Sequence, residues 1–328
     1  MTYNYCRNLI NTLSFHQHNV RFCTTLNMGE LISTYEETPK ELAYKIKETR
    51  EKIRNNLING IIPTHCLNCI YKNNEYITQD KITKIDLFYW FHCNCSCFYC
   101  SYRDETKGEF SDKEKIGNPI IYDTIKELYR LNEINTEELD VNVGGGELGV
   151  LKEFPKLIDL FLENNVKTVF CESSGIKYSK AVEKLLRKGK GCITVAVCSG
   201  TPETYKKIKR RDKYRQVMKN LKKYVNAAKK DKNAPDNIYN VVSKYIILEN
   251  CNNNLTEVKK WLSESQKCGI KHVEVSMEFC WGTKSKKGQK IEDYNYEIFK
   301  YVENECKNLG LLLRENKTSK ALMEKGVY

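Results

Sequence analysis

The feature that most constrains the fold is a regular alternation of two hydrophobic patterns from residue 84 onward. Short apolar runs typical of buried strands alternate with segments whose apolar residues recur at helical spacing, as in Leu157, Leu160 and Phe161. The strand-like runs are 85–92, 139–143, 168–171, 192–198, 239–248 and 272–277, and the helix-like segments are 120–131, 151–164, 178–188, 202–228, 255–267 and 294–309. Six βα units in succession predict an α/β fold with a parallel sheet, and six favour a partial (βα)6 barrel over the closed eight-stranded one.

The first 83 residues do not follow this pattern. They contain one helix-like segment, 40–57, with loop-like sequence on either side and little apolar material. We therefore predict two domains, a small cysteine-rich N-terminal module over 1–83 and a core over 84–328 with a C-terminal extension. A module with so small a hydrophobic core is expected to need a covalent or metal staple.

The chain has 15 cysteines among 328 residues and contains no run approaching the roughly 20 apolar residues that cross a bilayer. The first ten residues also lack the pattern of a secretory signal. We therefore expect a soluble cytoplasmic protein without a membrane partner. In a reducing compartment, clustered cysteines bind metal more often than they form disulfides.

The formal net charge of +12 is a weak guide to function. The basic residues are densest over 206–232, where they are interrupted by acids in a strongly helical stretch. A solvated helix face is the favoured interpretation, and a nucleic-acid surface is the alternative. Lysine greatly outnumbers arginine, which argues against phosphate recognition.

Three cysteines follow the first core strand directly, in the spacing Cys-x3-Cys-x2-Cys. They are Cys93, Cys97 and Cys100. Three thiolates on a short loop can hold three corners of a four-iron cluster and leave the fourth iron open to a ligand. Cys95 falls inside the loop at the wrong spacing and is interpreted as a spectator.

These cysteines, with Tyr99 before the last of them, resemble the signature of radical S-adenosylmethionine (SAM) enzymes. The second core strand ends in a glycine triplet followed by Glu147, which resembles the Gly-Gly-Glu motif of that family. In the family this motif contacts the amino group of SAM. The resemblance implies SAM-binding roles for Gly145, Gly146 and Glu147, and glycines do let a backbone approach a ligand closely.

The resemblance covers about residues 84–250 and includes the end of the fourth strand. Ser199 matches the family's serine that meets the SAM ribose and carboxylate, and Lys209 or Arg210 matches the basic residue that follows it. Cys280, after the sixth strand, is a candidate catalytic hydrogen donor or substrate contact at the functional end of the barrel.

The N-terminal region contains four further cysteines: Cys6, Cys23, Cys66 and Cys69. Four thiolates ending in Cys-x2-Cys could close a second iron–sulfur cluster. The segment resembles the auxiliary-cluster domain called SPASM, although that domain is usually C-terminal and richer in cysteine. A zinc site built from the same four residues is the alternative.

The resemblance implies a radical SAM enzyme that cleaves SAM reductively to a 5′-deoxyadenosyl radical. It implies a [4Fe-4S] cluster and SAM as cofactors, a second [4Fe-4S] cluster, and an electron donor such as flavodoxin or ferredoxin. We expect hydrogen abstraction from a peptide or small-molecule substrate, leading to oxidation, crosslinking or epimerisation. The alternatives are a radical SAM enzyme acting on RNA and a non-catalytic zinc-binding module.

Overall fold

The computed structural model describes residues 3–23, 31–34, 37–67, 74–77, 80–100, 118–229, 240–277 and 293–315. The chain divides into two compact units. Unit 1 comprises Met1–His92 and Phe110–Phe170, and unit 2 comprises Cys93–Glu109 and Cys171–Tyr328. The chain passes from unit 1 to unit 2 within strand β8 (Thr168–Ser173).

The sheet of unit 1 is built around β6 (Lys84–Phe88), whose three central residues are fully buried. β7 (Asp140–Val143) and β2 (Thr12–His16) both pair with β6 in parallel. β3 (Asn19–Arg21) then pairs antiparallel with β2, and β4 (Leu31–Ser33) pairs antiparallel with β3. Residues near the N-terminus therefore share a sheet with the first strand of the predicted core.

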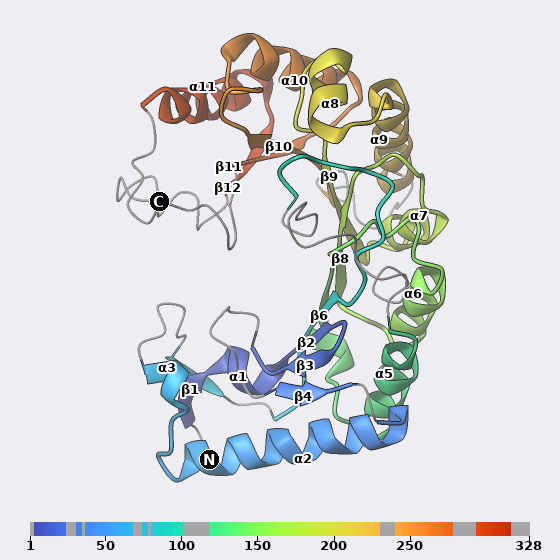
Figure 1. Ribbon diagram of the computed structural model, residues 1–328, viewed down its shortest axis with the longest axis vertical. Coiled ribbons are helices and arrows are strands. Elements are labelled where there is room, and N and C mark those ends of the chain that lie inside the picture. Colours follow the sequence, from blue (N-terminus) through green and yellow to red (C-terminus); the bar gives the residue numbers. More distant parts are fainter. Residues whose placement is uncertain are drawn as a thin grey trace. The chain divides into compact units, whose positions relative to one another are not determined.

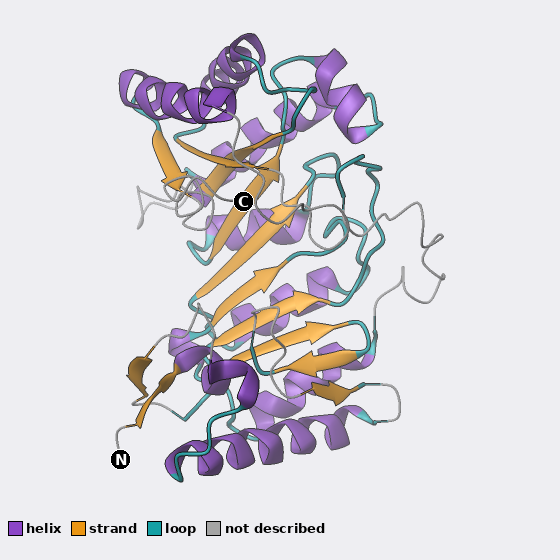
Figure 2. Ribbon diagram, turned by 60° about the vertical axis from the view of Figure 1, so that its left-hand side comes forward, coloured by secondary structure: helices purple, strands orange, loops and turns teal. Residues whose placement is uncertain are grey.

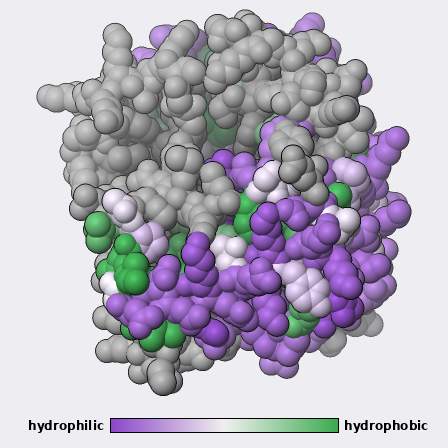
Figure 3. All heavy atoms as spheres, turned by 60° about the horizontal axis from the view of Figure 1, so that its bottom comes forward, coloured by the Kyte–Doolittle hydropathy of each residue, from purple (hydrophilic) through white to green (hydrophobic). Residues whose placement is uncertain are grey.

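The longest helix of unit 1 is α2 (Pro39–Ile58). It begins at a capping box in which the Thr38 side chain accepts from the Glu41 backbone and Glu41 accepts from the Thr38 backbone. Figure 1 shows α2 running beneath β2, β3 and β4, and it packs against α5 (Ile120–Arg130). The coloured part of the face viewed in Figure 3, on the side where α2 lies, is mainly hydrophilic with small hydrophobic areas.

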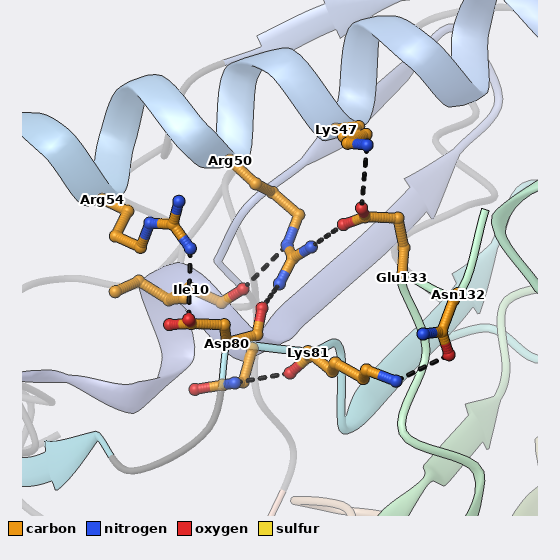
Figure 4. Close-up of polar contacts among 9 residues, drawn as sticks. Ile10, Lys47, Arg50, Arg54, Asp80, Lys81, Asn132 and Glu133 are labelled. Carbon is orange, nitrogen blue, oxygen red and sulfur yellow. Dashed lines mark hydrogen bonds and ion pairs between the residues drawn. The ribbon is translucent and has the colours of Figure 1, made fainter.

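Arg50 links α2 to three other segments of unit 1 (Figure 4). Its side chain is 5% exposed, and its Nε donates to the Ile10 carbonyl at 3.1 Å. The other two nitrogens donate to the Glu133 carboxylate and to the Asp80 carbonyl. One guanidinium thus joins α2 to α1, to the segment that precedes β6 and to the segment that follows α5.

Unit 2 contains β9 (Gly191–Ala196), β10 (Val241–Ile247), β11 (His272–Met277) and β12 (Leu312–Glu315). Each pairs in parallel with the next, so the four strands form a parallel sheet in this order (Figure 2). Their backbones are connected through helices, which is the connection that parallel strands require.

Five helices accompany these strands: α7 (Lys180–Arg187), α8 (Pro202–Lys209), α9 (Tyr214–Ala228), α10 (Leu255–Lys267) and α11 (Asp293–Leu309). Trp261 shows how α10 covers the sheet. Its Nε1 donates to the Ser243 hydroxyl at 2.9 Å, and its ring lies 4.9 Å from the ring of Tyr245. Ser243 and Tyr245 therefore lie on the helix-covered face of β10.

The remaining elements are short. They are β1 (Tyr3–Cys6), α1 (Arg7–Asn11), α3 (Thr64–Leu67), β5 (Asn74–Ile77), the 3-10 helix η1 (Thr136–Glu138) and α6 (Phe154–Glu163). β1 and β5 pair antiparallel in a separate two-stranded sheet. No helix among the described residues is both long enough and apolar enough to cross a membrane.

The predicted alternation of strands and helices is confirmed from β6 to α11, and the predicted bounds of α10 and β11 are those observed. Two expectations are wrong. The single helix expected over 202–228 is interrupted where Arg210 adopts a left-handed φ of 53°, and β2, β3 and β4 lie where only loops were expected. The domain boundary after residue 83 stays a prediction, to be weighed against the pairing of β2 with β6.

Candidate metal and cofactor site

The cysteine loop of residues 93–100 lies in unit 2 and docks on the end of α8. The Ser96 amide donates to the Lys209 carbonyl, and the Phe98 amide donates to the Ile208 carbonyl, each at 3.2 Å. Arg211 Nε donates to the Asn94 carbonyl at 2.9 Å. Because the last carbonyls of a helix lack intrahelical partners, the loop satisfies the helix end while the helix fixes the backbone of the loop.

The thiols of this loop differ in their surroundings. Cys93 is exposed, Cys97 and Cys100 are half-buried, and Cys95 is buried. A hydrogen bond with Cys95, aided by the nearby Lys209 ammonium, lowers the pKa of the Cys97 thiol to about 6 against the opposing effect of burial. Hydrogen bonds with Cys93 and Cys97, together with burial, raise the pKa of Cys95. The hydrogen bond between the two thiols thus favours the deprotonated form of Cys97 and the protonated form of Cys95. The interpretation of Cys95 as a spectator stays a prediction.

Lys209 contacts Tyr99 of the loop and is only 2% exposed. Its Nζ donates to the Tyr99 hydroxyl at 2.9 Å and to Cys198 Sγ at 3.6 Å, and the Tyr99 hydroxyl lies 3.6 Å from the same sulfur. Burial disfavours the charged lysine, but the combined effect of Cys198, Tyr99 and Cys97 raises its pKa above the ordinary value. Lys209 thus connects the cysteine loop to the end of β9.

The glycine triplet lies in unit 1, at the end of β7. Gly146 N donates to the Trp90 carbonyl and Glu147 N donates to the His92 carbonyl, both at 2.8 Å. A Cβ on Gly146 would stand 2.4 Å from the His92 oxygen, so only glycine allows this approach. Glu147 is 1% exposed, and its carboxylate accepts from the Gly149 amide at 3.2 Å.

The end of β9 carries Ser199. The amides of Val197 and Cys198 both donate to the Lys244 carbonyl, at 3.0 and 3.1 Å, and Cys198 has a φ of 60°. This is a local bulge, a device that re-aims a side chain at a strand end. The Ser199 hydroxyl that follows it is fully buried and has no hydrogen-bond partner among the described residues.

Sequence reasoning missed two residues that hold this strand end. Asn252 is fully buried, and its Nδ2 donates to the carbonyls of Cys198 and Ile246 at 2.7 and 2.8 Å. Glu257 of α10 accepts from the Gly200 amide at 2.8 Å and from the Thr201 hydroxyl at 2.7 Å. Neither residue belongs to a spaced motif, and only the asparagine-rich stretch after β10 hinted at a turn.

The structure describes the predicted site residues in separate parts of the chain. Unit 2 contains the cysteine loop with Tyr99, together with Ser199 and Lys209, whereas Gly145, Gly146 and Glu147 lie in unit 1. Cys23 and Cys66 are half-buried in unit 1. Cys69, Cys280 and the side chain of Cys6 lie outside the described residues. The auxiliary site and the catalytic role of Cys280 therefore stay predictions.

The residues present fit a cluster and SAM. Thiolate is the form that ligates iron, and Cys97 favours it. The buried Ser199 hydroxyl, which has no hydrogen-bond partner among the described residues, is a feature that a bound ligand would explain. No three His, Cys, Asp or Glu residues in the described part of the chain converge as ligands of a single ion. A cubane cluster differs from a single ion, because each cysteine binds a different iron.

The part of the chain that contains these residues matches a known protein family. Residues 89–242 match the model of the Radical SAM superfamily. The match contains the cysteine loop, the glycine triplet, Ser199 and Lys209. The match identifies a radical SAM domain over residues 89–242, which is slightly less than half of the chain. A domain of this superfamily implies a [4Fe-4S] cluster and SAM as its cofactors.

Curated relatives match over part of their length only. A probable GTP 3′,8-cyclase of Methanococcus vannielii is 28% identical over 118 residues, which is 35% of this chain and 36% of the relative. A probable GTP 3′,8-cyclase of Methanocaldococcus jannaschii is 25% identical over 138 residues, which is 42% of this chain and 43% of the relative. The aligned region thus spans well under half of either relative.

Solved structures share the fold. Streptococcus suis SuiB bound to its precursor peptide SuiA has a TM-score of 0.53 at 12% identity and covers 96% of this chain and 73% of its own. The same protein bound to SAM gives 0.55 at 13% identity, covering 83% and 56%. The anSMEcpe enzyme with bound SAM gives 0.50 at 17% identity, covering 71% and 63%. These likenesses confirm the predicted α/β fold of the radical SAM barrel class.

Proposed function

We propose that this enzyme binds a [4Fe-4S] cluster through Cys93, Cys97 and Cys100 and abstracts hydrogen from a peptide or a small molecule. The observation that carries the proposal is the docking of the cysteine loop on the end of α8, where the buried Lys209 donates to Tyr99 of the loop and helps to lower the pKa of the Cys97 thiol. When bound, the cluster and SAM supply a radical able to break an unactivated carbon–hydrogen bond.

The chain's own residues bind and orient the cofactors in this proposal. Glu147 and the carbonyls of the glycine loop accept hydrogen bonds from the ammonium group of SAM. The buried Ser199 hydroxyl meets the ribose or carboxylate and gains the partner that it lacks. The hydrogen bond from Lys209 to Tyr99 holds the loop that carries the cysteine ligands in place.

A peptide is the favoured substrate class, and oxidation, crosslinking or epimerisation is the expected outcome. The support is the fold match to the SuiB complex with its precursor peptide, which covers nearly the whole of this chain. A nucleotide is the second candidate, because the curated relatives are named GTP 3′,8-cyclases. A donor such as flavodoxin or ferredoxin would deliver the electron.

We also propose that Cys6, Cys23, Cys66 and Cys69 hold an auxiliary [4Fe-4S] cluster in a SPASM-like arrangement. The support is the number and spacing of these cysteines. A zinc ion in the same position is the competing proposal.

The test is anaerobic reconstitution followed by iron, sulfide and zinc analysis and a SAM-cleavage assay with dithionite. Two four-iron clusters predict about eight irons per chain. Replacing Cys93, Cys97 and Cys100 by alanine should leave about four irons and abolish SAM cleavage. The matched control is Cys268→Ala, since Cys268 is a half-buried cysteine of α10 whose thiol donates to the Met218 carbonyl.

Persistence of SAM cleavage in the triple variant would refute the assignment of the reactive cluster. A second variant tests the auxiliary cluster separately. Replacing Cys66 and Cys69 by alanine should remove about four irons while the first cluster remains. Loss of one zinc ion instead, with the iron count unchanged, would replace the auxiliary cluster by a structural zinc site.

A further inference from the structure

Three charged residues lie side by side on one face of the unit 2 sheet. Lys244 of β10 is the register partner of Glu274 of β11, and Glu274 is the register partner of Arg314 of β12. Successive side chains of a strand alternate between faces. Because Ser243 contacts α10 through Trp261, Lys244 and its two partners lie on the face that α10 does not cover.

Ion pairs connect the three charged side chains. Lys244 Nζ lies 2.8 Å from one Glu274 oxygen, and Arg314 Nη1 lies 3.5 Å from the other. Arg314 Nη1 also donates to the Thr194 hydroxyl of β9 at 3.4 Å. Glu274 and Thr194 are each 6% exposed. The guanidinium is thus held between two buried groups whose own positions are fixed by the sheet.

Two nitrogens of the Arg314 guanidinium have no hydrogen-bond partner in the described part of the chain. Its side chain is 44% exposed, and both of its contacts use Nη1 at long distances. Neither Nε nor Nη2 contacts another residue in the described part of the chain. Nε and Nη2 form one edge of the guanidinium fork, which matches the two oxygens of a carboxylate.

The row lies next to the strand end that carries Ser199. Lys244 pairs with Ala196, the last residue of β9, and its carbonyl accepts from the amides of Val197 and Cys198. Ser199 follows immediately. The row thus begins at the strand end that we propose for SAM and reaches Arg314 on β12, on the same face of the same sheet.

We propose that Arg314, positioned by Glu274 and Thr194, binds a carboxylate of the substrate, such as an acidic side chain of a peptide. The assignment of that carboxylate to a substrate rests on the proposed function. A polyphosphate fits poorly, because Glu172 and Glu274 balance the charges of Lys244 and Arg314, and Glu172 lies close enough to raise the pKa of Lys244. A single guanidinium edge without a partner in the described part of the chain suits one carboxylate.

The test is a titration of the reconstituted enzyme, labelled with ¹⁵N at arginine Nε, with three probes. The first probe is N-acetyl-glutamic acid α-amide, which carries one carboxylate. The second is the neutral N-acetyl-glutamine amide, and the third is GTP. The Arg314 signal is identified by its disappearance in the variant Arg314→Lys. The control is Arg187→Lys, because Arg187 is an arginine of α7 with similar exposure, 41%, that is already paired with Glu183.

We expect the acidic probe to shift the Arg314 signal saturably, in the millimolar range typical of a single ion-paired contact, both in the wild type and in Arg187→Lys. The neutral probe should bind at least about tenfold more weakly, because it lacks the charge that the fork recognises. An absent shift at concentrations up to about 50 mM, or an equal shift with the neutral probe, would overturn the proposal. Tighter binding of GTP at this signal would contradict the choice of a carboxylate.

The titration is independent of SAM cleavage. If the wild type cleaves SAM and the acidic probe does not bind, the carboxylate site is wrong and the proposed function stands. If the probe binds and the wild type does not cleave SAM, the radical chemistry is wrong and the anion site stands.

Discussion

At the scale of single residues, Gly146 is tightly packed in the glycine motif of the proposed SAM site. An added Cβ would stand 2.4 Å from the His92 oxygen and 2.6 Å from Trp90 Cδ1. We expect Gly146→Ala to lower the free energy of unfolding by about 1–3 kcal/mol, as overpacking does, and to reduce SAM binding. Urea denaturation and equilibrium dialysis of SAM measure the two effects.

Gly60 offers the matched control for this substitution. Its φ is 73°, but a Cβ there meets nothing within 4 Å. Gly60→Ala should cost about 1 kcal/mol from backbone conformation alone and leave SAM binding unchanged. Equal effects of both substitutions on SAM binding would show that the close approach at Gly146 has no functional meaning.

His16 provides a pH-dependent contribution to stability. It lies on β2 with its Nε2 3.0 Å from the Ser14 hydroxyl, and burial together with the positive charge of Arg21 lowers its pKa to about 4. The unfolded chain takes up a proton near the ordinary pKa of about 6.5, whereas the folded chain does so only near pH 4. The contribution of His16 to the free energy of unfolding is therefore complete above about pH 6.5 and falls as the pH decreases toward 4.

We expect His16→Gln to remove part of this fall, on the order of 1 kcal/mol between pH 7 and pH 5. The measurement is the free energy of unfolding of both proteins at the two pH values. The comparison uses the difference between the proteins, since other groups titrate in the same range. Parallel pH profiles for the two proteins would mean that His16 titrates normally in the folded state.

The sequence predicts the three cysteines of the loop from their spacing, and it predicts the glycine triplet and Ser199 from a resemblance to a known family. The roles of these residues stay predictions. Asn252 was not found, because its role is to join the ends of β9 and β10, and such contacts depend on tertiary structure. The contact of Lys209 with Tyr99 was missed for the same reason, since 110 positions separate the two residues.

At the scale of elements, Arg50 links α2 to three other segments of unit 1. Replacing Arg50 by methionine leaves the half-buried Glu133 carboxylate and the carbonyls of Ile10 and Asp80 without their donor. We expect a loss of about 3 kcal/mol or more in the free energy of unfolding, as is typical when one partner of a buried pair is removed. Chemical denaturation measures it.

Arg54 is the control on the same helix. Its pair with Asp80 spans 3.2 Å, and both side chains are substantially exposed, 33% and 65%. Arg54→Met should change the free energy of unfolding by at most about 1 kcal/mol, because solvent screens exposed ion pairs. A cost for Arg50→Met no larger than that for Arg54→Met would show that burial of Arg50 does not strengthen the attachment of α2.

The sequence predicted elements best where a long periodic pattern ended at clear signals. α10 begins after Asn254, whose side chain accepts from the Glu257 amide, and it ends just before Gly269, whose φ is 81°. β2 was missed because the antiparallel strand β3 follows it rather than a helix, so it lies outside the alternation of strands and helices. The break at Arg210 was missed because no glycine or asparagine marks its left-handed conformation.

At the scale of the whole molecule, the main question is whether residues 1–83 form a separable module. β6 uses β2 as its neighbour along five residue pairs, from Thr12 with Lys84 to His16 with Phe88. Leu13 and Phe15 of β2 are fully buried, and Leu42 and Ile46 of α2 are fully buried as well. The N-terminal segment thus contributes strand pairing and core to unit 1.

We therefore expect the fragment 84–328 to lose cooperative unfolding and to aggregate, because it exposes one edge of β6 and the apolar surface that α2 covers. Co-expression with residues 1–83 should restore soluble protein by supplying both elements in trans. Size-exclusion chromatography and thermal unfolding followed by circular dichroism make the comparison. A monomeric fragment 84–328 that unfolds cooperatively would instead establish the predicted boundary after residue 83, and would reduce the pairing of β2 with β6 to a contact between domains that fold independently.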